Sequence, residues 1–377
     1  MSVVIEHARK LDALGVVDDF WILISNESII ATGTGQSPPS SQRINAKGNW
    51  LTPGFIDLHS HGGGGHSFDN GPEAISAGLQ THRRRGTTRS IVSLVANPMD
   101  SLLTNLGSIA DLVSVDPLIL GSHLEGPFLS RHRSGAHNAS YLRDPSIAEV
   151  RQLISAARGT LRQVTLAPEL PGALAAIDAF VNAGVIVALG HTEASFELTN
   201  TAFDRGAGIL THAFNAMPGI HHRAPGPVTA AFGDDRIVIE LILDGEHVHP
   251  QVAALLFAEA PGRIALITDA MAAADSPDGD YALGTLDVTV LQGLARLRGT
   301  STIAGSTLTQ DVALRFAMEI TELSPTAAIE AVTLTPARAL GLEHQHGLLA
   351  PGYVADAVLL TPDWQVTEVW ANGSLVE

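Results

Sequence analysis

The chain has 377 residues, of which 45% are hydrophobic and 16% charged, a balance that supports a large buried core and excludes global disorder. A formal net charge of −17 argues against non-specific nucleic-acid binding, and the absence of cysteine excludes disulfides, thiolate metal ligands and a cysteine nucleophile. Because no apolar run reaches about 18–20 residues and MSVVIEHARKLD lacks the features of a signal peptide, we expect no membrane partner and predict a cytoplasmic location.

Both ends of the chain have the pattern of short strands separated by turns. Residues 1–50 and 345–377 show period-2 alternation interrupted by Gly, Pro and Ser. Near the C-terminus, Asn372 and Gly373 are typical of a two-residue hairpin turn. Since chain termini often lie close together, the two ends are expected to combine into one small β-sandwich domain, with residues 51–344 forming the other domain.

Between the two ends, eight short apolar runs predict strands, and most gaps are long enough for a helix. A last helix pair is predicted within 307–341, and the Gly-rich stretch 277–306 is predicted to be a β-like excursion after the eighth strand. Alternating strands and helices predict an α/β fold, a (β/α)8 TIM barrel. The predicted strands lie near residues 54–59, 90–95, 118–124, 163–168, 185–190, 208–212, 237–243 and 263–268.

Imidazole and carboxylate side chains follow five of these apolar runs. Strands that each deliver a polar group at the carboxyl end are how a parallel barrel builds an active site. Imidazole and carboxylate suit Zn²⁺ and similar divalent ions, so the pattern predicts a metal site. The residues concerned are His59, His61, Glu125, His191, His212 and Asp269.

Each of these residues also has a simpler interpretation. A lone HxH can be two polar residues at a strand end, and either His191 or His212 alone is more typical of a core histidine bonded to a backbone carbonyl. Glu125 alone could cap a surface turn, and Asp269 could be a helix N-cap. It is their occurrence together, each after an apolar run, that favours the metal site.

Glu125, His191 and His212 supply three protein ligands, the number typical of a catalytic zinc site. His59 and His61 are at i and i+2, so on a strand both face one side and could hold a second ion. The only lysines, Lys10 and Lys47, precede the first predicted barrel strand, which excludes a Schiff-base or carbamylated lysine within the barrel. A bridge between two metals would therefore be a carboxylate, with Glu125 as the candidate.

Further residues predict a substrate site. His137 follows the third strand, Arg223 the sixth and His247 the seventh. Arg223 suits phosphate because a guanidinium donates bidentate hydrogen bonds, although a solvated loop charge is an equally good interpretation. The backbone N–H groups of Asn215 and Ala216 could hold an anion. Asp269 is also a candidate for general acid/base work.

Seven segments in this order resemble one family. They are PGFIDLHSHG, SHLEGPFL, ALGHTEAS, THAFNAMPG, DGEHVH, LITDAM and STIAGSTLT. From about residue 50 to the C-terminus the chain resembles the N-acetylglucosamine-6-phosphate deacetylases of the amidohydrolase superfamily. The resemblance implies hydrolysis of the acetamide to glucosamine 6-phosphate and acetate. We predict one or two divalent ions per subunit and Zn²⁺ as the metal, although His and carboxylate ligands also accept Fe²⁺, Mn²⁺ or Co²⁺.

The resemblance also implies residue roles. Glu125, His191 and His212 would hold the main metal, Asp269 would be the catalytic acid/base, and His137 would polarise the acetyl carbonyl. The sugar phosphate would be bound by His247, by Arg223 reaching across a homodimer interface, and by the backbone of Asn215 and Ala216.

Two departures from the family pattern bear on this site. The chain keeps His59 and His61, which some members lack, so a second metal is plausible and the choice between one and two metals stays open. Ala224 stands in the loop RAPG where the family usually has Glu, which affects the phosphate loop rather than the reaction. Two rival interpretations remain: an amidohydrolase for a different N-acyl sugar or cyclic amide, and a non-catalytic barrel.

Overall fold

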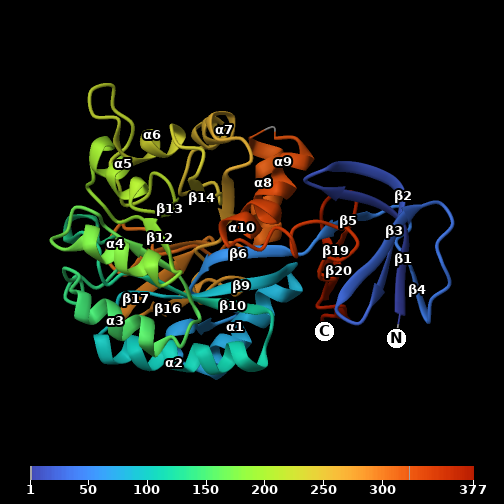
Figure 1. Ribbon diagram of the computed structural model, residues 1–377, viewed down its shortest axis with the longest axis horizontal. Coiled ribbons are helices and arrows are strands. Elements are labelled where there is room, and N and C mark those ends of the chain that lie inside the picture. The colour runs from blue at the N-terminus through green and yellow to red at the C-terminus, as the bar shows by residue number, and fades with distance from the viewer. Residues whose placement is uncertain (1, 322) are drawn as a thin grey trace.

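The computed structural model describes residues 2–321 and 323–377, and places them in a barrel and a smaller β unit beside it (Figure 1). Both chain ends lie in the β unit. The proposed division into 1–50 with 345–377 and 51–344 stays a prediction, and Met1 and Glu322 lie outside the described residues.

The larger unit is the predicted barrel. Its parallel sheet has the strand order β15-β14-β13-β12-β11-β10-β9-β6. The ring closes between the first and last of these strands, where Asp269 N donates to His59 O (2.8 Å) and His61 N to Ala270 O (2.7 Å). All eight predicted strands are confirmed. They are β6 (Phe55–Ser60), β9 (Thr87–Leu94), β10 (Ile119–Glu125), β11 (Leu161–Leu166), β12 (Ile186–Leu189), β13 (Ala207–Leu210), β14 (Val238–Ile242) and β15 (Ile264–Ile267).

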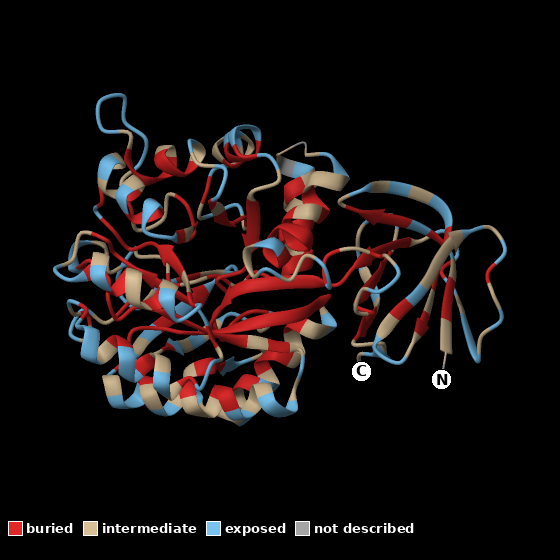
Figure 2. Ribbon diagram, in the orientation of Figure 1, coloured by how far each residue is buried: buried red, intermediate tan, exposed pale blue. Residues whose placement is uncertain are grey.

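The barrel strands are buried because helices cover their outer faces (Figure 2). Every residue of β6 and β9 is buried, as expected for parallel strands enclosed on both faces. Several helices begin at a serine cap; for example, Ser195 Oγ accepts from Leu198 N at the start of α5. The helices are α1 (Pro72–Arg84), α2 (Met99–Val115), α3 (Ile147–Ala156), α4 (Ala173–Asn182), α5 (Phe196–Asp204), α6 (Gly226–Phe232), α7 (Pro250–Glu259), α8 (Gln310–Ile320), α9 (Pro325–Val332) and α10 (Leu334–Ala339).

The predicted excursion after the eighth strand is a three-stranded antiparallel sheet. It consists of β16 (Gly279–Leu283), β17 (Leu286–Leu291) and β18 (Leu294–Leu297). Its buried residues Leu283 and Val288 pack with Val95 and Met271 from the carboxyl ends of β9 and β15. The excursion therefore covers part of the barrel mouth. A small hairpin of β7 (Gly62–Gly63) and β8 (His66–Ser67) lies after β6.

The strands from both chain ends join one hydrogen-bonded sheet of the order β21-β20-β19-β5-β1-β2-β3, with β4 paired to β1. The predicted hairpin turn is confirmed, since Asn372 (φ 53°) and Gly373 (φ 77°) both have the positive φ that a type I′ turn requires. The strands are β1 (Ser2–Asp12), β2 (Gly15–Ser25), β3 (Ser28–Thr34), β4 (Gln42–Asn45), β5 (Trp50–Pro53), β19 (Ala357–Leu360), β20 (Val366–Ala371) and β21 (Ser374–Leu375).

A buried ion pair links the two units. Arg89 of β9 donates through Nε to Asp356 Oδ2 (2.6 Å) and through Nη2 to Asp356 Oδ1 (3.1 Å). The same guanidinium donates to Pro117 O and to Asn372 Oδ1 of the hairpin turn.

In the described part of the chain, no helix is long and apolar enough to cross a membrane.

We expect Arg89→Ala to lower the free energy of unfolding by about 3–5 kcal/mol, because it removes the guanidinium that pairs with the buried Asp356 carboxylate. The measurement is equilibrium unfolding in urea. Arg205→Ala is the matched control, because the Arg205–Asp178 pair is exposed and its loss should cost less than about 1 kcal/mol. Equal losses in the two variants would contradict the structural role given to Arg89.

Candidate functional site

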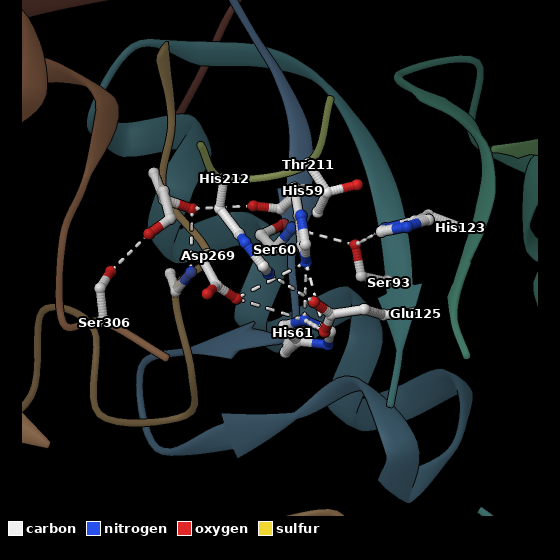
Figure 3. Close-up of polar contacts among 12 residues, drawn as sticks. His59, Ser60, His61, Ser93, His123, Glu125, Thr211, His212, Asp269 and Ser306 are labelled. Carbon is white, nitrogen blue, oxygen red and sulfur yellow. Dashed lines mark hydrogen bonds and ion pairs between the residues drawn. The ribbon is translucent and has the colours of Figure 1, made fainter. Parts of the chain in front are cut away.

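The residues of the proposed metal site leave their strands in a strained backbone conformation. His191 (φ 46°), His212 (φ 26°) and Asp269 (φ 47°) all have positive φ. This left-handed region costs an L-residue about 1–2 kcal/mol, and such residues cluster at functional sites. The sharp departure from β12, β13 and β15 brings these three side chains to one cavity. Figure 3 shows two of them, His212 and Asp269, beside His59, His61 and Glu125.

One oxygen of Glu125 faces two imidazoles. Glu125 Oε1 lies 3.0 Å from His191 Nε2 and 3.0 Å from His212 Nε2, and the two nitrogens are 3.1 Å apart. Ligand atoms on one tetrahedral zinc ion are separated by about 3.3 Å, given Zn–N bonds of about 2.0–2.1 Å. The three buried atoms thus already have the spacing of a coordination sphere.

The other oxygen faces a second cluster. Glu125 Oε2 is 3.1 Å from His61 Nε2 and 3.5 Å from His59 Nε2, and these nitrogens are 3.0 Å apart. Asp269 Oδ1 completes the cluster, 3.3 Å from His61 Nε2 and 3.6 Å from His59 Nε2. Figure 3 shows His59 and His61 between the carboxylates of Asp269 and Glu125. Glu125 therefore lies between the two clusters, where a carboxylate that bridges two ions would have to lie.

The outer ring nitrogens explain why two of the inner nitrogens are free to bind metal. His191 Nδ1 is 2.7 Å from Arg133 O, and because a carbonyl only accepts, Nδ1 carries the hydrogen and Nε2 keeps its lone pair. His59 Nδ1 likewise lies 3.3 Å from Glu240 Oε2, a carboxylate–histidine contact typical of metal ligands. Lone pairs facing Glu125 at 3.0–3.5 Å repel unless a cation lies between them, so this donor set fits a divalent metal.

His137 differs from the other imidazoles. Its Nδ1 accepts a hydrogen bond from Ala96 N (3.2 Å), so a neutral ring carries its hydrogen on Nε2. Burial lowers the pKa of His137 despite the nearby Glu125, which keeps the ring neutral. Its Nε2, 3.2 Å from Glu125 Oε2, is therefore a hydrogen-bond donor at the edge of the clusters rather than a lone pair.

The carboxylates of the clusters stay ionised although they are buried. Burial alone would raise the pKa of Asp269, but the charge of His59 and the hydrogen bond of His61 hold it below its usual value. Burial disfavours charged His61, yet its hydrogen bonds to Asp269 and Glu125 raise its pKa to about 9. The clusters therefore favour positive charge, which a proton or a divalent cation can supply.

A cavity of about 370 Å³ opens onto both clusters. Among the predicted substrate residues, His137, Asn215, Ala216 and His247 line it. Arg223 does not line it, since its loop 218–225 lies between β13 and α6, is exposed at 219–224, and projects from the barrel (Figures 1 and 2).

Sequence reasoning missed several residues of the site. Arg133 and His132 line the cavity from the loop after β10, and their only signal was a cluster of charged residues near His137. Thr302, Ile303 and Gly305 line it from the segment after β18. Glu240 could have been found as a charged residue inside the apolar strand β14, where it accepts from Gln163 Nε2 (2.8 Å).

A closed parallel barrel with a shared carboxylate at its carboxyl face and two clusters suited to divalent ions defines the class of metal-dependent barrel hydrolases. The chain belongs to the amidohydrolase family, whose model matches residues 50–376.

Relatives of the chain are sugar-phosphate deacetylases. It is 38% identical over 332 residues to N-acetylgalactosamine-6-phosphate deacetylase of Escherichia coli O157:H7, a match that covers 87% of each chain. It is 32% identical to N-acetylglucosamine-6-phosphate deacetylase of Lysinibacillus sphaericus over 85% of this chain and 84% of that protein.

Solved structures of the same kind share the fold. N-acetyl-D-glucosamine-6-phosphate deacetylase of Mycobacterium smegmatis, an Asp-to-Ala variant in complex with N-acetyl-D-glucosamine 6-phosphate, has 40% identity and a TM-score of 0.94, covering 100% of this chain and 99% of that one. The Thermotoga maritima N-acetylglucosamine-6-phosphate deacetylase has 28% identity and a TM-score of 0.90, with 99% of both chains covered. The predicted fold class and family are confirmed.

We expect the metal content of two variants to distinguish a site for one ion from a site for two. Glu125→Ala should reduce bound metal at both, because its oxygens face both sets of imidazoles, whereas His61→Ala should affect one. The measurement is elemental analysis of each purified protein, with circular dichroism as the control for folding. An unchanged metal content in His61→Ala would contradict a second metal site.

Proposed function

We propose that this chain removes the acetyl group of N-acetylglucosamine 6-phosphate, giving glucosamine 6-phosphate and acetate. The observation that carries this proposal is the cavity in which His137 and Asp269 adjoin the shared Glu125 carboxylate. The relation to a deacetylase solved in complex with that sugar phosphate supports the choice of substrate.

In this proposal Glu125, His191 and His212 hold one divalent ion, and His59 and His61 hold a second ion that Glu125 also contacts. Zn²⁺ is the proposed metal, because zinc favours imidazole and carboxylate ligands at low coordination number. When bound, such an ion polarises a carbonyl and lowers the pKa of water to about 7.

His137 is proposed to orient the acetyl group. Its Nε2–H is fixed by the Ala96 hydrogen bond and donates to the acetyl oxygen. As water adds to the carbonyl carbon, negative charge grows on that oxygen, and a donor already in place stabilises it without reorganisation. A neutral His137, which its lowered pKa ensures, keeps the ring in this donor tautomer.

Asp269 is proposed as the proton carrier. Its lowered pKa keeps it ionised at neutral pH, so it can accept the proton that the attacking water releases. It then returns this proton to the amine nitrogen as the carbon–nitrogen bond breaks. Water and the acetamide are thereby converted into acetate and the free amine, and Asp269 regains its initial charge.

The sugar phosphate is proposed to contact His247 and the Asn215–Ala216 backbone from the same subunit. Burial alone would lower the pKa of His247, but the hydrogen bond and the charge of Asp244 raise it. A raised pKa favours the charged imidazolium form of His247 beside the phosphate. A cytoplasmic location is part of the proposal, because an ionised phosphate enters a bilayer core only at a large free-energy cost.

Arg223 is proposed to bind the same phosphate from the second subunit of a homodimer. It is exposed on the projecting loop, outside the cavity of its own chain. Next to that loop an apolar groove is formed by Phe214, Val252 and the exposed Ile220 and Leu255. A second copy of the chain would bury this apolar surface and bring Arg223 to its partner's cavity.

Deacetylation of N-acetylgalactosamine 6-phosphate is the second candidate function, and the 38% identity to an enzyme of that name favours it. The two sugars differ only in the orientation of the 4-hydroxyl group. Acetate release from both sugar phosphates and from unphosphorylated N-acetylglucosamine decides among the candidates. Faster acetate release from N-acetylglucosamine 6-phosphate supports the first function, and faster release from N-acetylgalactosamine 6-phosphate supports the second. No acetate release from either sugar phosphate contradicts both functions.

We expect Asp269→Asn to lower kcat by about 10²–10⁴-fold while metal content is retained, because the amide cannot carry the proton. Acetate release and elemental analysis are measured on the same preparation. Near wild-type turnover in this variant would remove Asp269 from the proton-transfer role.

Leu255→Asp should convert a dimer into a monomer, because it places a charge in the apolar groove. Light scattering after size-exclusion chromatography gives the mass, and Leu291→Asp, at a 68% exposed residue of the excursion, is the control. A wild-type monomer would contradict the homodimer.

A further inference from the structure

Outside the two imidazole clusters, the guanidinium of Arg133 is a polar group of the cavity that the proposed mechanism does not use. Arg133 ends the short 3-10 helix Arg131–Arg133 in the loop after β10. Its Nε is buried, and among the described residues it has no hydrogen-bond partner. Neighbouring Arg131, in contrast, donates to Ala139 O and Leu142 O and so holds the loop together.

The nearest carboxylate does not satisfy this group. Glu193 Oε1 is 3.9 Å from Arg133 Nε, beyond hydrogen-bond range, and both side chains are partly exposed. A buried donor without an acceptor is unfavourable, so an acceptor from a bound ligand would stabilise this conformation.

The backbone of Arg133 is tied to a residue of the metal site. Arg133 O accepts from His191 Nδ1 (2.7 Å), and Ser130 N donates to His191 O (2.9 Å). A Cβ on Gly135 would lie 3.1 Å from His191 Cε1, so the loop packs closely against that ring. The backbone that carries the Arg133 side chain is therefore held in place at the wall of the cavity.

The carboxylates of the cavity make a positive charge at Arg133 important for binding an anion. Of the described residues that line it, Arg133 carries the only guanidinium, and none is a lysine. The cavity also contains the carboxylates of Glu125 and Asp269, and the chain as a whole has a net charge of −17. An anionic substrate needs a local positive charge to overcome this field.

We propose that Arg133 binds the phosphate of the substrate within its own subunit, through charge-assisted hydrogen bonds from the guanidinium. This inference rests on the proposed function and extends it: the phosphate is held in cis by Arg133 and in trans by Arg223. Arg133 is thus a residue that selects phosphorylated over unphosphorylated amino sugars.

The test compares phosphorylated and unphosphorylated ligands in Arg133→Gln. We expect kcat/KM for N-acetylglucosamine 6-phosphate to fall about 10- to 100-fold, as for a lost hydrogen bond to a charged group, while kcat/KM for N-acetylglucosamine is unchanged. Arg133→Lys should recover part of the loss. Arg151→Gln on α3, which removes a positive charge from an exposed residue outside the cavity, is the matched control.

Elemental analysis checks that the variants keep their metal. Equal losses for both substrates in Arg133→Gln, or lost metal, would show that Arg133 acts by positioning His191, and would overturn the inference. No loss for either substrate would overturn it as well.

A binding measurement separates the inference from the proposed function. Calorimetric titration of the metal-loaded protein with glucosamine 6-phosphate and with glucosamine needs no turnover. If wild type releases no acetate but Arg133→Gln weakens binding of glucosamine 6-phosphate alone, the proposed function fails and the phosphate role of Arg133 stands. If acetate is released normally and the variant binds both ligands as wild type does, only the role of Arg133 fails.

Discussion

The site depends on one carboxylate whose two oxygens face different pairs of imidazoles. Glu125 Oε1 adjoins His191 and His212, and Oε2 adjoins His59 and His61, all at 3.0–3.5 Å. Five buried groups with converging lone pairs are stable together only if positive charge lies among them. The barrel brings them together because β6, β10, β12 and β13 all end at the same face.

The surroundings of Glu125 determine what each neighbouring group can do. An imidazole whose outer nitrogen donates to a carbonyl or carboxylate presents a lone pair, as His191 and His59 do. An imidazole whose outer nitrogen accepts from a backbone N–H presents a hydrogen, as His137 does. The same side chain is thus suited to bind metal in one place and to stabilise negative charge in another.

Loops beyond the strands form much of the cavity wall around Glu125. The loop after β10 carries both His137 and Arg133, and it is bonded to the backbone and ring of His191. The excursion after β15 adds Leu283 to the wall, and the segment after β18 adds Ile303. In the proposed function, substrate choice therefore lies in loop residues held against the imidazole clusters, while the strand ends provide the reactive groups.

The strand positions and the residues of the two clusters were predictable from the sequence, because each strand is a short apolar run with a polar residue directly after it. The proposed metal ligands share this signal, so His59, Glu125 and His191 could be grouped without knowing their distances. Arg133 and His132 carry no such signal, since charged loop residues are usually solvated.

Three properties were decided by the tertiary structure alone. One is which oxygen of Glu125 serves which cluster, and another is the tautomer of His137, set by Ala96 from a different strand end. The third is which loop arginine lines the cavity: Arg133 does and Arg223 does not. Apolar periodicity is a local property that the sequence records directly, whereas hydrogen-bond partners and cavity walls join residues far apart in the chain and exist only once the barrel has closed.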